Sequence, residues 1–214
     1  MSVKRLYPFL EPGRAESPEL DAALARSVAD KARDSRQANE RFFAEQGPAL
    51  ITAARALAEV YRAGGRLLAM GNGGSSCDAS HIAVEFVHPV TTGRPALAAV
   101  NLAADIAHLS AVANDVGFEH VFVRPLMAHG RKGDALAGFS TSGNSANLIA
   151  AFAKAKDMGM VTIGFAGGDG GRMKSCGHVE HCLVVPTQSI HRVQEAHVAA
   201  YHILWDLVHT LLAR

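Results

Sequence analysis

The stretch 135-ALAGFSTSGNS-145 joins an apolar run to a turn rich in hydroxyl groups. Its first five residues predict a buried strand, and the amphipathic residues 146–158 that follow predict a helix. In a parallel α/β sheet ligands collect at such strand-to-helix turns, and the amino terminus of a helix favours a phosphate. An ordinary helix cap needs one Ser or Asn, not four hydroxyls. The stretch therefore predicts a phosphate or anion site formed by Ser140, Thr141, Ser142 and Ser145.

Strand and helix patterns alternate through the rest of the chain. Further strands are predicted at 66–70, 97–102, 161–166 and 181–185. Helices are predicted at 77–87, 105–113, 120–129 and 193–212, with turns at Asn114-Asp115 and 167–171. Such alternation gives a parallel sheet covered by helices on both faces. The predicted fold class is α/β: a three-layer α/β/α sandwich with a parallel, flavodoxin-like sheet, preceded by amino-terminal helices.

We expect a single domain with three parts. Residues 1–17 contain Pro8, Pro12 and Gly13 and predict a flexible leader. Residues 18–64 predict amino-terminal helices at 18–45 and 49–62, separated at Gly47-Pro48 because proline ends helices. Residues 65–214 predict the α/β domain itself.

The amino-acid composition indicates which classes of protein this chain can belong to. The chain has 214 residues, a formal net charge of +1 and 49% hydrophobic residues, so it can bury a sizeable core. The absence of a basic stripe disfavours direct binding of nucleic acid. Three cysteines, Cys77, Cys176 and Cys182, are an odd number and predict structural thiols in a reducing compartment. No signal peptide or apolar run of spanning length is present, so we expect a cytoplasmic protein without a membrane partner.

A second loop and two helices carry the metal-ligating residues. Residues 71–75, GNGGS, form another strand-to-helix turn, and a sugar phosphate could lie across both loops. His81 and Glu85, four residues apart, share one helix face. Gln194 and His202, eight apart, lie within about a quarter turn on the closing helix. The four could converge on one hard-to-borderline divalent metal, with a position left for water or substrate. His197 is a competing candidate, and an ordinary solvated His/Glu pair is the alternative.

These residues together resemble the sugar isomerase (SIS) domain family and, within it, the phosphoheptose isomerases. The resemblance runs from about residue 66 to the end, so residues 65–214 would be the SIS domain. It is carried by 71-GNGGS-75 with 77-CDA-79, His81 with Glu85, residues 140–147, and 192-RVQEAH-197 with His202. Asn114-Asp115 and 169-DGG-171 match as well.

The resemblance implies a sugar-phosphate isomerase that interconverts sedoheptulose 7-phosphate and D-glycero-D-manno-heptose 7-phosphate through an enediolate, for lipopolysaccharide or related glycan synthesis. It implies a homotetramer with sites near subunit boundaries, and one Zn²⁺ per subunit. The metal ligands would be His81, Glu85, Gln194 and His202, and the acid/base pair Glu85 and His202. The residues matching substrate and phosphate binders are Asn72, Gly73, Ser75, Asp115, Ser140, Thr141, Ser142, Ser145 and Gln194.

The chain departs from the family pattern at three positions. Pro89 stands where many phosphoheptose isomerases have an Arg, His191 where an Asp is usual, and Ser76 where a His often follows the loop serine. A proline cannot replace the forked donors of a guanidinium. Two other functions remain open: a non-catalytic SIS protein that binds a partner, as the replication-initiator-associating members do, or a sugar-phosphate sensor. The binding members lack the His/Glu pair that this chain keeps, which favours the enzyme.

Overall fold

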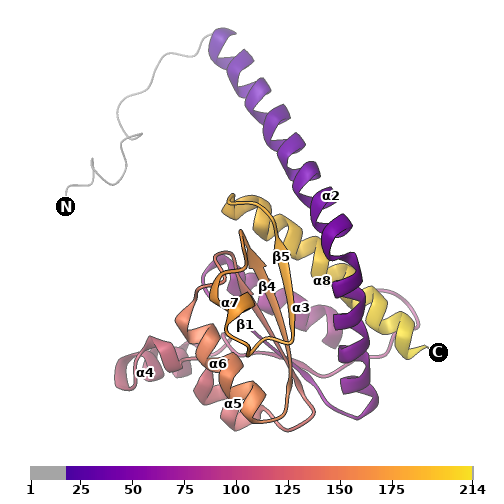
Figure 1. Ribbon diagram of the computed structural model, residues 1–214, viewed down its shortest axis with the longest axis vertical. Coiled ribbons are helices and arrows are strands. Elements are labelled where there is room, and N and C mark those ends of the chain that lie inside the picture. The colour runs from indigo at the N-terminus through magenta and orange to yellow at the C-terminus, as the bar shows by residue number, and fades with distance from the viewer. Residues whose placement is uncertain (1–17, 214) are drawn as a thin grey trace. The chain divides into compact units, whose positions relative to one another are not determined.

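A computed structural model describes residues 18–213 of the chain, so the predicted leader at 1–17 lies outside the described residues. The first element is the helix α2, Pro18–Arg62 (Figure 1). Residues up to Arg36 form one compact unit and residues from Gln37 onward another. The second unit contains the sheet and every predicted site residue.

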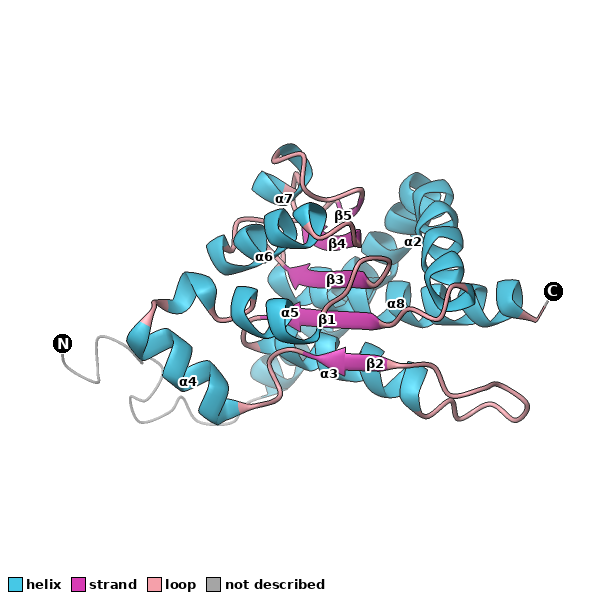
Figure 2. Cartoon of the chain, turned by 90° about the horizontal axis from the view of Figure 1, so that it is seen from below, coloured by secondary structure: helices cyan, strands magenta, loops and turns pink. Residues whose placement is uncertain are grey.

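Five parallel strands form the sheet, and Figure 2 shows them aligned in one direction. The strands are β1 Leu67–Gly71, β2 Ala99–Asn101, β3 Ala135–Ser140, β4 Val161–Gly167 and β5 His181–Val185. Their order is β2-β1-β3-β4-β5, which confirms the flavodoxin-like arrangement. β1 and β3 are neighbours, with Gly71 opposite Phe139. The loops that follow these two strands therefore open side by side at the carboxyl edge of the sheet.

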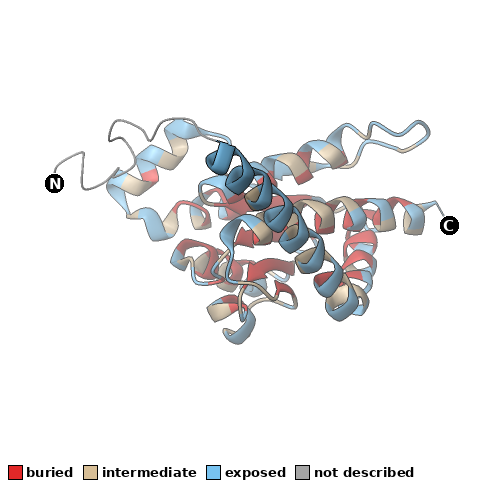
Figure 3. Ribbon diagram, turned by 90° about the horizontal axis from the view of Figure 1, so that it is seen from above, coloured by how far each residue is buried: buried red, intermediate tan, exposed pale blue. Residues whose placement is uncertain are grey.

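Helices cover both faces and complete the predicted three layers. One face packs against residues of α2 from Phe42 onward and against α3 Gly74–Val87 and α8 Ile190–Leu212. The other face packs against α4 Ile106–Asp115, α5 Val123–His129, α6 Ala146–Asp157 and α7 Gly171–Ser175. The strands alternate between the two cores: Leu67 belongs to the first and Leu68 to the second. Figure 3 shows the buried positions concentrated in the sheet and on the helix faces toward it.

The break predicted at Gly47-Pro48 is wrong, because α2 continues through Pro48. Proline removes one backbone hydrogen bond, yet Phe42 before it and Leu50 after it are both fully buried in the same core. Packing on both sides holds the two segments in one helix, and the hydroxyl of Thr52 donates to the carbonyl of Pro48 at 3.0 Å. Tertiary contacts here outweigh the local signal.

Other boundaries differ by a few residues. The strand predicted at 97–102 shortens to Ala99–Asn101, because the Leu97 amide donates to the last turn of α3 at Phe86. Asn114-Asp115 closes α4 instead of forming a turn. The helix predicted at 120–129 begins at Val123, after a 3₁₀ turn at Phe118–His120. The short helix α7 was not predicted, and α8 begins at Ile190 instead of Val193.

Two further findings bear on the class of protein. No helix among the described residues is long and apolar enough to cross a membrane. The three cysteines are free thiols, and Cys77 is exposed on α3 while Cys176 and Cys182 pack against the second core. Burial raises the pKa of the Cys182 thiol to about 11, so this thiol stays protonated at neutral pH.

Candidate functional site

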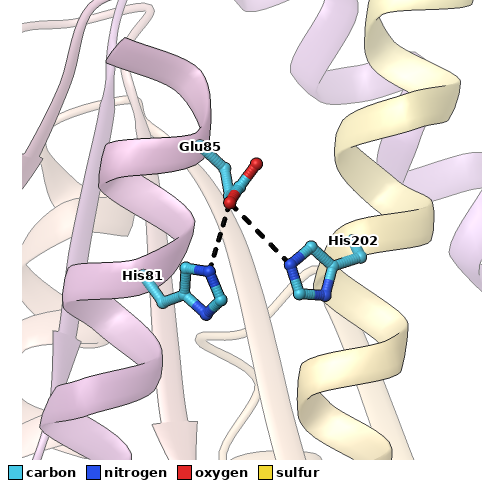
Figure 4. Close-up of side chains that lie close together, drawn as sticks. All are labelled: His81, Glu85 and His202. Carbon is cyan, nitrogen blue, oxygen red and sulfur yellow. Dashed lines mark hydrogen bonds and ion pairs between the residues drawn. The ribbon is translucent and has the colours of Figure 1, made fainter. Parts of the chain in front are cut away.

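Two imidazoles converge on one carboxylate between α3 and α8, as Figure 4 shows. His81 Nε2 lies 3.1 Å from Glu85 Oε1, and His202 Nε2 lies 3.9 Å from the same oxygen. The imidazole rings stand almost perpendicular, with centroids 4.9 Å apart. Glu85 is 15% exposed, whereas the two histidine side chains are 44% and 40% exposed. The group is therefore anchored at its carboxylate and open to solvent at its imidazoles.

The separations fit a metal ion. Ligand atoms about 2.1 Å from a zinc-like ion lie roughly 3.0–3.4 Å from each other at octahedral or tetrahedral angles. One atom from each of the three residues lies within 4.8 Å of the others, so small side-chain movements suffice to close the group around an ion. Two histidines and a glutamate form a donor set typical of catalytic zinc sites. The residues present therefore fit the metal that the sequence predicts.

Gln194, on α8, lies beside the start of α3, away from the three converging side chains. A Cβ atom placed on Gly74 would lie only 2.4 Å from Gln194 Nε2, so the amide rests against the first residue of α3. His81 follows seven residues later, which is about 10 Å along the helix axis. Within a single chain, the Gln194 side chain lies beside the loop at 71–75. Its role as a metal ligand stays a prediction.

Tyr201 and Trp205, which sequence reasoning missed, contact the group, and Asp78 lies near it. The Tyr201 hydroxyl lies 2.7 Å from His81 Nδ1, and Trp205 Nε1 donates to the Glu85 carbonyl at 2.8 Å. Asp78, 6% exposed, sits three residues before His81. Burial raises the pKa of Asp78 to about 6, and nearby His81 partly offsets this. In the sequence, Tyr201 and Trp205 fit apolar core positions of the helix α8. Only the Tyr hydroxyl and the Trp ring N–H distinguish them from purely apolar residues.

His197, the competing ligand, is excluded by its position. Its side chain is fully buried between Phe139 and Phe165, and Nε2 lies 3.3 Å from the Ala166 carbonyl. Burial lowers the pKa of His197 to about 4, partly offset by that backbone contact. His197 is a neutral core residue at physiological pH.

The hydroxyl-rich turn forms where it was predicted, between β3 and α6. Ser140 is buried at the end of β3, and its Oγ lies 2.9 Å from the Oγ of Ser145, the residue that caps α6. The Ser142 Oγ accepts a hydrogen bond from the Asn144 amide at 3.2 Å. Thr141 is half-buried in the same turn. The four hydroxyls thus gather at one helix amino terminus, and their contact with a phosphate stays a prediction.

Glycine is required inside this turn. Gly143 has φ 65°, and a Cβ there would lie 2.1 Å from the Gly170 carbonyl oxygen. The loop before α7 therefore packs directly against the turn. Arg172 and Lys174 line a depression of about 640 Å³ beside the hydroxyl-rich turn and the loop before α7. Asn144 and Asp169 line it as well. These two cations also escaped sequence reasoning, because the helix that carries them is only five residues long.

The first loop is tied to the second. The amides of Asn72 and Asn147 exchange two hydrogen bonds of 2.9 Å. Gly73 caps α3, and Ser75, 5% exposed, donates its backbone N–H to the Asn72 carbonyl. The expectation that both loops open at one edge of the sheet is confirmed.

Asp115 and the three positions that depart from the family pattern take no part in the link between Asn72 and Asn147. Asp115 ends α4, exposed, and accepts a hydrogen bond from Asn114 at 2.7 Å. Pro89 follows the end of α3, and His191 is exposed in the first turn of α8. Ser76 donates its hydroxyl to the Gly73 carbonyl. The role of Asp115 in holding sugar hydroxyls stays a prediction.

Comparisons with known proteins agree with this geometry. Residues 32–167 match the SIS domain family. The chain is 41% identical over 190 residues to the phosphoheptose isomerase of Roseiflexus sp., covering 89% of this chain and 95% of that protein. A phosphoheptose isomerase structure from Francisella tularensis matches with a TM-score of 0.83 and 31% identity, covering 87% of this chain and 98% of that one. The corresponding structure from Neisseria gonorrhoeae matches with a TM-score of 0.82 and 36% identity, covering 87% and 99%.

Proposed function

The chain belongs to the phosphoheptose isomerase family of SIS domain proteins, and from that membership we propose the substrate, the metal and the roles of the site residues. The reaction is an aldose/ketose isomerisation of a sugar phosphate. The proposed substrate is sedoheptulose 7-phosphate, and the product is D-glycero-D-manno-heptose 7-phosphate. The observation that carries the proposal is the convergence of His81 and His202 on Glu85 from helices far apart in sequence.

The reaction moves a carbonyl group from C2 to C1. A base removes a proton from C1 while O2 gains one, which gives an enediol; O1 then loses its proton and C2 gains one. We assign the base and acid to Glu85 and His202, because a carboxylate and an imidazole can both be tuned to exchange protons near neutral pH. The hydroxyls of Ser140, Thr141, Ser142 and Ser145 would hold the phosphate.

The metal site is proposed from its donor set. His81, Glu85 and His202 would hold Zn²⁺, with Gln194 as a further ligand. A bound ion would supply Lewis-acid stabilisation of the negative charge that develops on the sugar oxygens. The half-exposed imidazoles leave room for substrate next to the carboxylate.

The position of Gln194 supports a shared site. Its amide rests against Gly74, about two turns of α3 before His81. We propose that the protein works as a cytoplasmic homotetramer and that Gln194 of one copy completes the metal site of a neighbouring copy. A shared site agrees with the expectation that sites lie near subunit boundaries. It also agrees with the position of Gln194 away from His81 within one chain.

The departures from the family pattern bear on specificity. Pro89 offers no donor, so the heptulose loses one forked contact that an arginine would supply. Arg172 and Lys174 lie beside the phosphate turn and are candidates to compensate for that loss. The non-catalytic reading is not favoured, because the His/Glu pair is intact and the relatives are isomerases.

Turnover and metal content test the proposal together. The purified full-length protein, loaded with Zn²⁺ and dialysed, should retain about one ion per chain and isomerise sedoheptulose 7-phosphate in preference to shorter ketose phosphates. Glu85→Gln should abolish turnover on every ketose phosphate. A protein that retains no ion after exposure to Zn²⁺ and dialysis, and that turns over no ketose phosphate, would overturn the proposed function.

A further inference from the structure

Tyr201 holds the ring of His81 from the side opposite to Glu85. Its hydroxyl lies 2.7 Å from His81 Nδ1, and its side chain is 1% exposed. The phenol ring packs edge-on against Phe139, with centroids 5.8 Å apart, and against the His81 ring at 5.4 Å. Because packing fixes the ring on these sides, the hydroxyl has little freedom to leave His81.

The two nitrogens of His81 are therefore both engaged. Nδ1 meets Tyr201 and Nε2 meets Glu85 at 3.1 Å. A neutral imidazole carries one proton, so one nitrogen donates and the other accepts. When Nε2 carries the proton it donates to Glu85, and Nδ1 accepts from the Tyr201 hydroxyl. When Nδ1 carries the proton, it donates to the Tyr201 oxygen and Nε2 is left with its lone pair.

A metal ion at Nε2 requires the second of these tautomers. The hydroxyl of Tyr201 then accepts from His81 and must direct its own hydrogen elsewhere. Asp78 Oδ2 on α3 is a buried acceptor without a hydrogen-bond partner among the described residues, and no contact between it and the Tyr201 hydroxyl is present in this structure. Asp78 lies three residues before His81, on the same face of α3.

We propose that Tyr201 is the positioning residue of the metal site: its hydroxyl oxygen accepts the Nδ1 hydrogen of His81 and so stabilises the tautomer that presents Nε2 to the ion. The inference rests on the proposed metal site. Ligating histidines generally depend on such a partner at the other ring nitrogen, and its loss lowers metal affinity about 10–100-fold.

The test removes one oxygen atom and measures zinc affinity on the full chain. Tyr201→Phe keeps the packing but removes the hydroxyl, so the Zn²⁺ dissociation constant, measured by competition with a chromophoric chelator, should rise about 10–100-fold. Tyr61→Phe is the matched control, because the hydroxyl of Tyr61 is also buried but has no hydrogen-bond partner in the described chain. This control should keep the wild-type zinc affinity. Thermal melts of both variants without zinc separate lost packing from lost coordination.

A second readout needs no variant. Long-range ¹⁵N NMR of the zinc-loaded wild-type chain should show His81 protonated at Nδ1 and metal-bound at Nε2. Coordination through Nδ1, or a Tyr201→Phe variant that folds and binds zinc as tightly as the wild type, would overturn the role of Tyr201 while leaving the proposed function intact. A wild-type chain that binds no zinc would overturn both.

Discussion

Asn72 and Asn147 exchange two hydrogen bonds of 2.9 Å and join the loops after β1 and β3. The two residues are 75 positions apart in the chain, and parallel pairing of the two strands brings them together. Asn147 also accepts from the Leu148 amide in the first turn of α6. The link therefore fixes the first loop relative to the helix that begins at the phosphate turn.

Breaking this link should loosen both loops together. Asn72→Ala and Asn147→Ala each leave a partly buried amide without its partner, at about 1–3 kcal/mol of stability. In the double variant the second loss should be smaller, with a coupling energy of about 1 kcal/mol. Urea unfolding of the four proteins measures it. Strictly additive losses would show that the two amides act independently.

The phosphate turn gives a prediction about substrate binding. Ser145→Ala should raise the KM for a sugar phosphate about 10–100-fold, because a hydrogen bond to a charged group is worth about 1.5–3 kcal/mol. Ser110→Ala, an exposed serine on α4, is the control and should leave KM unchanged. Zinc content should stay at the wild-type level in both. If Ser145→Ala keeps the wild-type KM, the turn does not hold the phosphate.

The shared site can be tested by mixing inactive subunits. Glu85→Gln and Gln194→Ala should each be strongly impaired alone. When the two are co-expressed, sites that combine Glu85 of one copy with Gln194 of another should form in about a quarter of the random pairings, and activity should recover to that extent. A site built within one chain would give no recovery, because every subunit lacks one of the two groups.

His197 predicts a dependence of stability on pH. Its pKa is about 4 in the fold and 6.5 in the unfolded chain, so between these values the unfolded chain holds a proton that the folded chain lacks. The free energy of unfolding should therefore fall as pH falls from 6.5 towards 4, by roughly 1.4 kcal/mol per pH unit from this residue. Denaturant titrations of wild type and His197→Gln should show their difference shrinking by about 2 kcal/mol between pH 7 and pH 5.

One control variant isolates the contribution of His197. His191→Gln, at an exposed position of the same helix, should keep the wild-type slope. Asp78 acts with the opposite sign, because burial raises its pKa from 3.8 to about 6 and the fold favours its protonated form in that range. Asp78 is present in both proteins, so its contribution cancels in the difference. Parallel pH curves for wild type and His197→Gln would contradict the buried-histidine argument.

The sequence was informative where one short pattern determines one local structure. The strand at His181–Val185 was predicted to the residue, and the turn after β3 formed as expected, because apolar runs and hydroxyl-rich turns act locally. The helix break predicted at Pro48 was wrong, because contacts with distant parts of the chain stabilise the helix on both sides of this residue. No local pattern can report such contacts.

The same contrast between local patterns and distant contacts applies to the candidate site. The spacing of His81 and Glu85 gave their common face, yet it could not decide between His197 and His202 on α8. That choice depends on which side of α8 the core occupies: the structure buries His197 in the core and brings His202 beside Glu85. Tyr201 could not be found from the sequence, because an aromatic residue at a core position gives no sign of where its hydroxyl points.

The contact between Gly74 and Gln194 has a consequence for how this protein can evolve. A methyl group at position 74 would displace a flexible amide 2.4 Å away, not a rigid backbone, so the fold tolerates the change while the amide moves. Drift at position 74 can therefore shift the amide of Gln194, a proposed metal ligand, without a change at His81, Glu85 or His202. Across descendants of this chain, positions 74 and 194 should change together, and a laboratory selection for altered substrate preference should recover Gly74 variants that melt like their parent.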